Sequence, residues 1–198
     1  MLLCSRLGSV AAAGLSLLAF GCTETSGPRT WVGRARASEE AVAIVEEAGA
    51  VLAYTCGGAT TFHTHSRWFT GTAGEAGAVE LTEEDWVFSA SLNDGASEAT
   101  AKGPGGEEVV FDVRPTDGED EGVYETTDSG CRTGVVLQAD PDGATRVQGT
   151  WCDSQENAAQ VTPVSPVEVQ SGRLHVRVDL SFLGEGLRDL YVLRVQEP

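Results

Sequence analysis

The stretch RLHVRVDLSF, residues 173 to 182, decides the fold class. Every second residue in it is apolar, namely Leu174, Val176, Val178, Leu180 and Phe182. The residues between them are polar, namely Arg173, His175, Arg177, Asp179 and Ser181. A period of two is typical of a β-strand with one face in the core and the other in water. The sequence therefore predicts a strand here with one wet face.

Two further stretches repeat this alternation. Their apolar faces are Trp86, Phe88, Ala90 and Leu92 in the first stretch and Val109, Phe111 and Val113 in the second. Turn signals rich in Asn, Asp, Gly and Pro separate the runs, at residues 93–95, 103–106, 140–143 and 171–172. Short strands without helical crossovers between them favour an antiparallel β-sandwich or barrel over a parallel sheet. We expect a mainly β fold of nine to eleven strands.

Residues 37–49, ASEEAVAIVEEAG, form the one stretch with helical features. Ser38 is a suitable N-cap, and the glutamates that follow it suit the positive end of a helix dipole. Apolar residues recur at three- and four-residue spacing, and Gly49 is a plausible stop. These features predict one short N-terminal helix over residues 38–48.

The N-terminus has the features of an export signal. An uncharged apolar run from Leu7 to Phe20 follows Arg6, and at about 14 residues it is too short to span a bilayer. Leu18-Ala19-Phe20-Gly21-Cys22 resembles the lipobox of bacterial lipoproteins, which implies cleavage before Cys22 and acylation of its thiol. An ordinary signal with an incidental cysteine is the alternative.

The resemblance implies a chain anchored in the cell envelope by several acyl chains, which hold a protein firmly. In such lipoproteins, Asp directly after the anchor cysteine favours retention at the inner membrane. This chain has Thr23 at that position, so the resemblance implies the outer membrane of a two-membrane cell. Three parts follow: a signal peptide over residues 1–22, a flexible tether over 23–36 and a single β-rich domain over 37–198.

Composition limits the possible partners. The chain has 198 residues and a formal net charge of −17. Such a charge repels nucleic acid and anionic lipid headgroups, so nucleic-acid binding is disfavoured. No sequence motif for a cofactor is present, and none is expected.

The cysteines predict one disulfide. Export places Cys56, Cys131 and Cys152 in an oxidising compartment. A hairpin folded at Asp140-Pro141-Asp142-Gly143, with Asp140 facing Gly143, pairs residues whose numbers sum to 283. This register places Cys131 directly opposite Cys152, within bridging distance. Pairings with Cys56 remain the rival arrangement.

Candidate sites for chemistry are few. His63 and His65, two apart on an expected strand, suit a shared metal ion, with His175 as a third ligand. The alternative is the polar face of a strand. Carboxylates at residues 117–121 suit Ca²⁺ or, alternatively, a solvated hairpin tip. No catalytic motif is recognisable, so we do not expect an enzyme.

Two functions are consistent with these observations. The first is a lipid-tethered β module that binds or scaffolds an envelope protein or a small ligand, with exposed aromatic residues such as Trp31 or Trp68 at the site. The second is a small metal-binding envelope protein that uses His63, His65 and His175.

The lipobox resemblance generates the first testable prediction. Replacing Cys22 by Ala removes the thiol that is acylated, so the variant is expected to leave the membrane fraction or to stay unprocessed. Fractionation together with mass spectrometry of the mature N-terminus measures this. An unmodified mature chain that begins at another residue contradicts the prediction.

Overall fold

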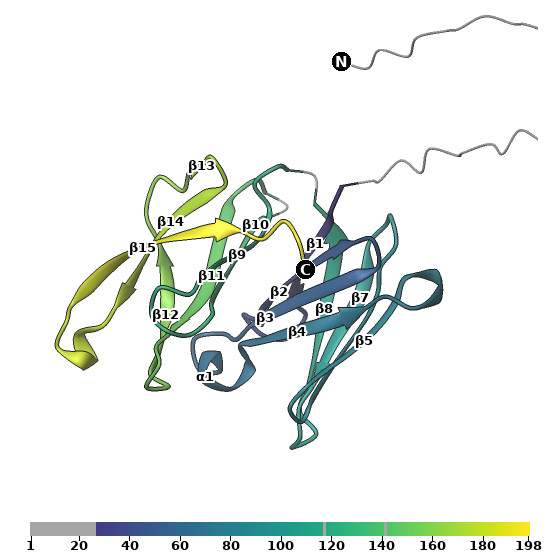
Figure 1. Cartoon of the computed structure of the whole chain (residues 1–198), viewed down its shortest axis with the longest axis horizontal. Helices are drawn as coiled ribbons and strands as arrows, with labels where there is room; N and C mark the ends of the chain where they lie inside the picture. The colour runs from purple at the N-terminus through teal and green to yellow at the C-terminus, as the bar shows by residue number, and fades with distance from the viewer. Residues whose placement is uncertain (1–26, 117, 141) are drawn as a thin grey trace, which may run out of the picture.

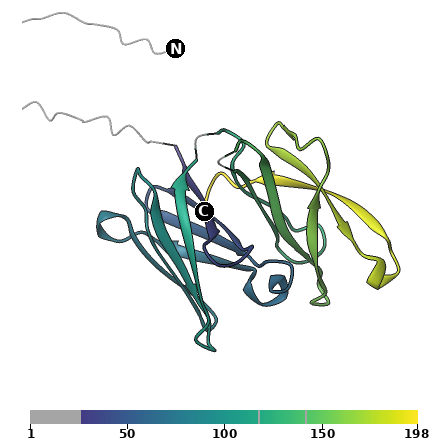
Figure 2. The same cartoon turned by 180° about the vertical axis from the view of Figure 1, so that it is seen from behind.

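The computed structural model describes residues 27–116, 118–140 and 142–198, and these form two antiparallel sheets that lie side by side (Figures 1 and 2). The first sheet has the order β4-β3-β2-β1-β8-β7-β6-β5. Its strands are β1 (Arg29–Ala35), β2 (Ala41–Glu47), β3 (Ala50–Cys56), β4 (Arg67–Thr72), β5 (Ala78–Glu83), β6 (Trp86–Ser91), β7 (Ser97–Lys102) and β8 (Glu108–Pro115). A bridge between Ala73 and Val79 joins its two ends. The sheet is therefore barrel-like.

The second sheet has the order β12-β11-β10-β9-β15-β14-β13, and β12 also pairs with β14. Its strands are β9 (Gly122–Thr126), β10 (Thr133–Ala139), β11 (Thr145–Cys152), β12 (Ala158–Pro163), β13 (Val169–Gln170), β14 (Arg173–Asp179) and β15 (Leu187–Arg194). The β12–β14 pairing closes six of these strands into a second barrel-like ring. The predicted mainly β, antiparallel fold is confirmed, but the described residues form fifteen strands rather than the expected nine to eleven.

Helical structure is limited to short turns. The single α-helix described is α1 (Phe62–His65), and two 3-10 turns are η1 (Glu75–Gly77) and η2 (Ser181–Leu183). None of the helices in the described part of the chain has the length and apolar character needed to cross a membrane.

Each sheet encloses a core made by the predicted alternation. Leu174, Val176 and Val178 of β14, together with the adjoining Leu180, are fully buried in the second core. The predicted faces of β6 and β8, with Trp86, Phe88, Phe111 and others, line the first core. Phe182 departs from the pattern, because β14 ends at Asp179 and Phe182 lies in η2 with 58% of its surface exposed.

The predicted helix over residues 38–48 is wrong, because residues 41–47 form β2. Val42 and Ile44 point into the first core, whereas Ala43 and Val45 point to the opposite side, against the second sheet. A strand that is buried on both faces has a continuous apolar run without visible alternation. The expected stop at Gly49 is instead a tight turn between β2 and β3, in which Gly49 has a φ of 88°.

The predicted tether is too long at its C-terminal end. Its residues 29–35 form β1, which lies at the centre of the first sheet between β2 and β8. Trp31 is 1% exposed, and its indole N–H donates to the carbonyl of Asn93 at 2.9 Å. The folded region therefore begins at β1 rather than at residue 37.

A third apolar cluster joins the two sheets, and we call it the seam. It is formed by Val32, Ala41, Ala43, Val45, Leu52, Tyr54 and Cys56 of the first sheet with Val123, Val136 and Val195 of the second part of the chain. The Tyr54 ring lies against Gly134, where a Cβ atom would overlap the ring. The Tyr54 hydroxyl donates to the Gly134 carbonyl at 3.1 Å. Close backbone approach at Gly134 therefore sets the distance between the sheets.

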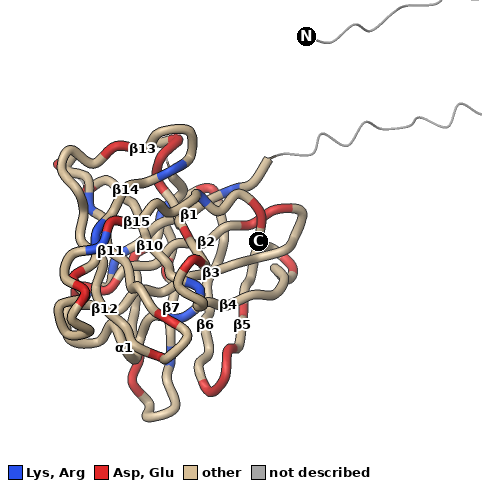
Figure 3. The backbone as a smooth tube through the Cα atoms, turned by 60° about the vertical axis from the view of Figure 1, so that its left-hand side comes forward, with Lys and Arg blue, Asp and Glu red and all other residues tan. Residues whose placement is uncertain are grey.

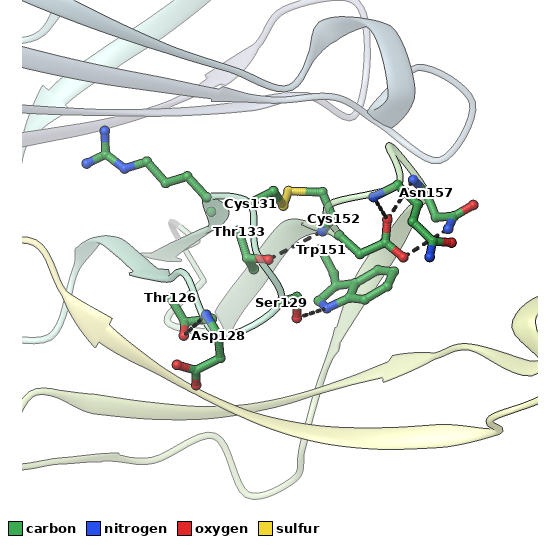
Figure 4. The surroundings of a disulfide bond; sticks show 12 residues. Thr126, Asp128, Ser129, Cys131, Thr133, Trp151, Cys152 and Asn157 are labelled. Atoms are coloured by element: carbon green, nitrogen blue, oxygen red, sulfur yellow. Dashed lines mark hydrogen bonds between the residues drawn. A yellow bond between two sulfur atoms is a disulfide. The ribbon is translucent and has the colours of Figure 1, made fainter.

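The disulfide Cys131–Cys152 forms as predicted, with the two Cα atoms 5.8 Å apart (Figure 4). The predicted register is wrong by one residue, since facing residues of β10 and β11 sum to 284. Gly143 adopts a φ of 85° and Asp140 pairs with Ala144, so the turn contains one residue more than expected. Cys131 still reaches Cys152 because it precedes β10 and is not held by the ladder.

The seam predicts the effect of a methyl group at Gly134. Gly134→Ala is expected to destabilise the fold by about 1–3 kcal/mol, the usual cost of overpacking. Gly74→Ala is the control, because a Cβ there meets only ordinary contact at 3.4 Å. Urea unfolding measures both variants, and equal midpoints would contradict the role of Gly134.

Cys56 gives a second prediction for the seam. Cys56 is free and fully buried, and burial raises the pKa of its thiol from about 9 to about 11. Between these values the unfolded chain loses this proton first, so stability falls as pH rises from 9 to 11. Between pH 9 and 11 this effect lowers the free energy of unfolding by about 2 kcal/mol, and we expect it to be absent in Cys56→Ala. Unfolding midpoints at several pH values measure it, and parallel curves for both proteins would contradict the assignment.

Candidate functional site

His63 and His65 lie on α1 and not on a strand, so their predicted placement on one strand face is wrong. Residues two apart on a helix do not face each other. His65 Nδ1 lies 2.5 Å from Glu40 Oε1, whereas the His63 ring lies 3.9 Å from the ring of Phe62. The two imidazoles therefore have different surroundings.

Glu40 fixes α1 to the first sheet. Its side chain is almost fully buried and accepts hydrogen bonds from Thr61 at 2.8 Å and from Ser38 at 2.9 Å, in addition to its contact with His65. The Thr55 hydroxyl also donates to the His65 carbonyl, at 2.7 Å. These contacts explain why the one helical turn has a defined position, and they give His65 a structural role.

His175 lies on β14 in the second sheet. Its Nε2 is 3.0 Å from Asp189 Oδ1, and its ring stacks on Tyr191 with the ring centres 4.6 Å apart. Within the described ranges, the structure contains no group of three His, Cys, Asp or Glu side chains placed to hold a metal ion. The three histidines of the predicted metal site are therefore not brought together.

The other residues that the sequence singled out are Cys22, the carboxylates at residues 117–121 and Cys56. Cys22 lies outside the described residues, as does Asp117 of the acidic stretch. In that stretch Glu121 is buried and accepts a hydrogen bond from Arg114 at 2.6 Å, so its carboxylate is turned toward protein. The Cys56 thiol contacts the Thr150 hydroxyl at 3.8 Å inside the seam and is fully buried.

The expected aromatic contact residues are also covered by protein. Trp31 is buried in the first core. Trp68 is half-buried: its ring is tilted by 32° against that of Tyr54 with the ring centres 4.4 Å apart, and the Arg132 guanidinium lies 3.9 Å from its own ring centre. Both tryptophans therefore contribute to packing.

The exposed apolar surface lies instead on β15. Leu187, Tyr191 and Leu193, which we call the β15 strip, are 66%, 54% and 55% exposed. They alternate with Leu190 and Val192, which are buried in the second core. The adjoining turn η2 adds the exposed residues Phe182 and Leu183. In the described part of the chain, Val87 is the one other large hydrophobic residue that is exposed.

The charge around the β15 strip differs from that of the whole chain. Residues 164–195 contain four basic residues, Arg173, Arg177, Arg188 and Arg194. They also contain four acidic residues, Glu168, Asp179, Glu185 and Asp189. This segment is formally neutral, whereas acidic residues are spread over the turns of the rest of the chain (Figure 3). The net charge of −17 therefore belongs to other parts of the molecule.

Polar side chains lie beside the strip in cross-strand pairs. His175 faces Tyr191, and Arg177 faces Asp189. Hydrogen bonds from Arg177 and His175 lower the pKa of the Asp189 carboxyl. The Arg173 guanidinium lies 5.7 Å from the Tyr191 ring, and a cavity of about 600 Å³ adjoins these residues. Aromatic and arginine side chains of this kind are enriched at protein interfaces.

Sequence reasoning missed the β15 strip. The signal is present in LRDLYVLR, residues 187–194, where apolar residues occupy both faces of one short strand. The pattern alone does not tell which of the two faces is covered, because covering depends on what packs against the strand.

Comparisons with known proteins give no relative from which a function can be transferred. No protein family, curated protein or solved structure matches this chain. The β15 strip, defined by exposure and charge, is therefore the candidate site that its own residues support best.

Proposed function

We propose that this chain is a lipid-anchored envelope protein that binds a partner protein through the β15 strip. The observation that carries the proposal is the exposure of Leu187, Tyr191 and Leu193 on one face of a single strand. Tyr191 and Leu193 are neighbours on this face, and Leu187 follows beyond Asp189. Grouped apolar residues rimmed by polar ones are typical of interaction sites, whereas single exposed apolar residues are ordinary.

The composition of the strip supports a protein partner. Tyrosine and arginine, like tryptophan, are enriched among the residues that carry binding energy at protein interfaces. The Tyr191 ring stacks on His175 and lies 5.7 Å from the Arg173 guanidinium, so it loses little side-chain freedom on binding. The buried residues Leu190 and Val192 fix the same strand to the second core, which makes the surface rigid.

The anchor is the second part of the proposal. The lipobox resemblance at Leu18 to Cys22 supports attachment to the envelope, and the absence of net charge in residues 164–195 supports binding at the face that carries β15. A protein of net charge −17 repels other acidic proteins. This repulsion is weakest at a surface whose own residues carry no net charge.

Site-specific photocrosslinking tests the proposal. A photoreactive phenylalanine analogue placed at Tyr191 in producing cells is expected to give a discrete protein adduct. The same analogue at Val87, an exposed residue on β6 of the other sheet, is the matched control and is expected to give none. No adduct at Tyr191, equal adducts at both positions, or adducts to lipid alone would contradict the proposal.

A further inference from the structure

Strand β15 has a partner on one side only for most of its length. It pairs with β14 from Leu187 to Leu193, but with β9 only at Leu193 and Arg194. No described strand pairs with the other side of residues 187–192. The second sheet therefore has an open edge beside the β15 strip.

The ladder with β14 shows which backbone groups lie on that edge. The N–H of Arg194 donates to Gly172, and the N–H of Leu180 donates to Gly186, both at 2.8 Å. In an antiparallel ladder the groups alternate between the two sides. Even-numbered residues of β15 therefore point their N–H and C=O groups at β14. The odd residues Leu187, Asp189 and Tyr191 point theirs outward, and we call these groups the free edge.

The disulfide turn keeps the edge open. After β9 the chain leaves the sheet in a turn, in which the N–H of Gly130 donates to the Thr127 carbonyl at 3.0 Å. The indole of Trp151 donates to Ser129 at 2.8 Å, and the turn leads into Cys131 (Figure 4). These contacts hold residues 127–131 on the second core and away from β15.

A cavity of about 450 Å³ separates the two segments. One wall is formed by residues 125–128, and Asp128 points toward β15 (Figure 4). The other wall includes Tyr191 and Leu193 of the β15 strip together with Arg173. The free edge thus reaches this groove at Tyr191, while Leu187 and Asp189 lie beyond its lining.

We infer that an extended segment of a partner protein adds to the free edge as an antiparallel strand; this inference rests on the proposed function. Edge strands with unpaired N–H and C=O groups are templates for such addition, and natural proteins usually protect them with proline, charge or a cover. Residues 187–193 contain no proline, and Arg188 and Asp189 are the only charged residues among them. The described residues include no element paired to this edge.

The site also defines the sequence of the segment. Side chains on the outer face pair across strands, so apolar residues at alternate positions of the segment meet Leu187, Tyr191 and Leu193. Basic residues at the positions between them match the carboxylates of Glu125, Asp128 and Glu197, which line the groove together with the guanidinium groups of Arg173 and Arg194. The net charge of −17 steers cationic partners to the protein as a whole. The expected ligand class is an extended peptide with alternating apolar and basic residues.

A fluorescent eight-residue peptide of alternating valine and lysine is the probe, and anisotropy measures its binding to the folded protein. With the valines on the outer face, the valine N–H groups point at β15 and the lysine N–H groups point away. N-methylation of the valine amides is therefore expected to weaken binding at least tenfold, and N-methylation of the lysine amides less than threefold. An alternating valine–glutamate peptide is expected to bind at least tenfold more weakly.

A protein variant gives the complementary test. Asp189→Pro removes one outward N–H without removing a bond to β14, whereas Asp189→Ala removes the same carboxylate and keeps the N–H. We expect at least tenfold weaker binding for Asp189→Pro and less than threefold for Asp189→Ala. Circular dichroism checks that both variants are folded, and the methylated peptides decide the question if the proline variant is not.

The other outcomes overturn the inference. Absence of binding, or equal binding of both methylated peptides, excludes strand addition; a crosslink at Tyr191 would then leave the proposed function intact. Equal binding of the glutamate peptide excludes the basic segment. Concentration-dependent dimers that Asp189→Pro abolishes would assign the free edge to a second copy of this chain.

Discussion

The close packing of the Tyr54 ring on Gly134 is the contact on which the arrangement of the two sheets depends. Each sheet closes on a core of its own, so nothing within either one requires the other. The seam is what holds the two sheets together, because β2 and β3 have apolar side chains on both faces. Small residues at Ala41 and Ala43 and the missing side chain at Gly134 allow close approach of the sheets.

A band of polar contacts at the seam fixes how the sheets are oriented. Ser66 and Thr150 hydroxyls lie 2.7 Å apart across it, and the Gln148 amide donates to the Gly57 carbonyl at 3.0 Å. Buried polar groups are tolerated only when paired, so such contacts favour one orientation over others that bury the same apolar area. This band lies at the segment leading from β3 to β4, which carries α1, and Glu40 holds α1 there.

The sequence predicted the strands that have one wet face and failed for the strand that has none. Alternation identified β6, β8 and β14, whereas β2 was mistaken for a helix because its two faces enter different cores. The disulfide was predicted despite a register error, since Cys131 precedes the ladder and tolerates a shift of one residue. The β15 strip was missed because exposure of an apolar face depends on the absence of a neighbour, which no local pattern encodes.

The position of the strip relative to the chain start bears on which partner it meets. The hairpin of β14 and β15, with η2 at its tip, extends away from the start of β1 in both views (Figures 1 and 2). For a chain anchored through Cys22, β1 is the first strand after the anchor, so the hairpin points away from the attachment point. In the proposed function, this end of the hairpin is available to an extended segment of another protein. The η2 end of the hairpin therefore lies away from the attachment point, whereas the Leu193 end of the β15 strip adjoins Arg194, which lines one cavity together with Pro28 and Thr30.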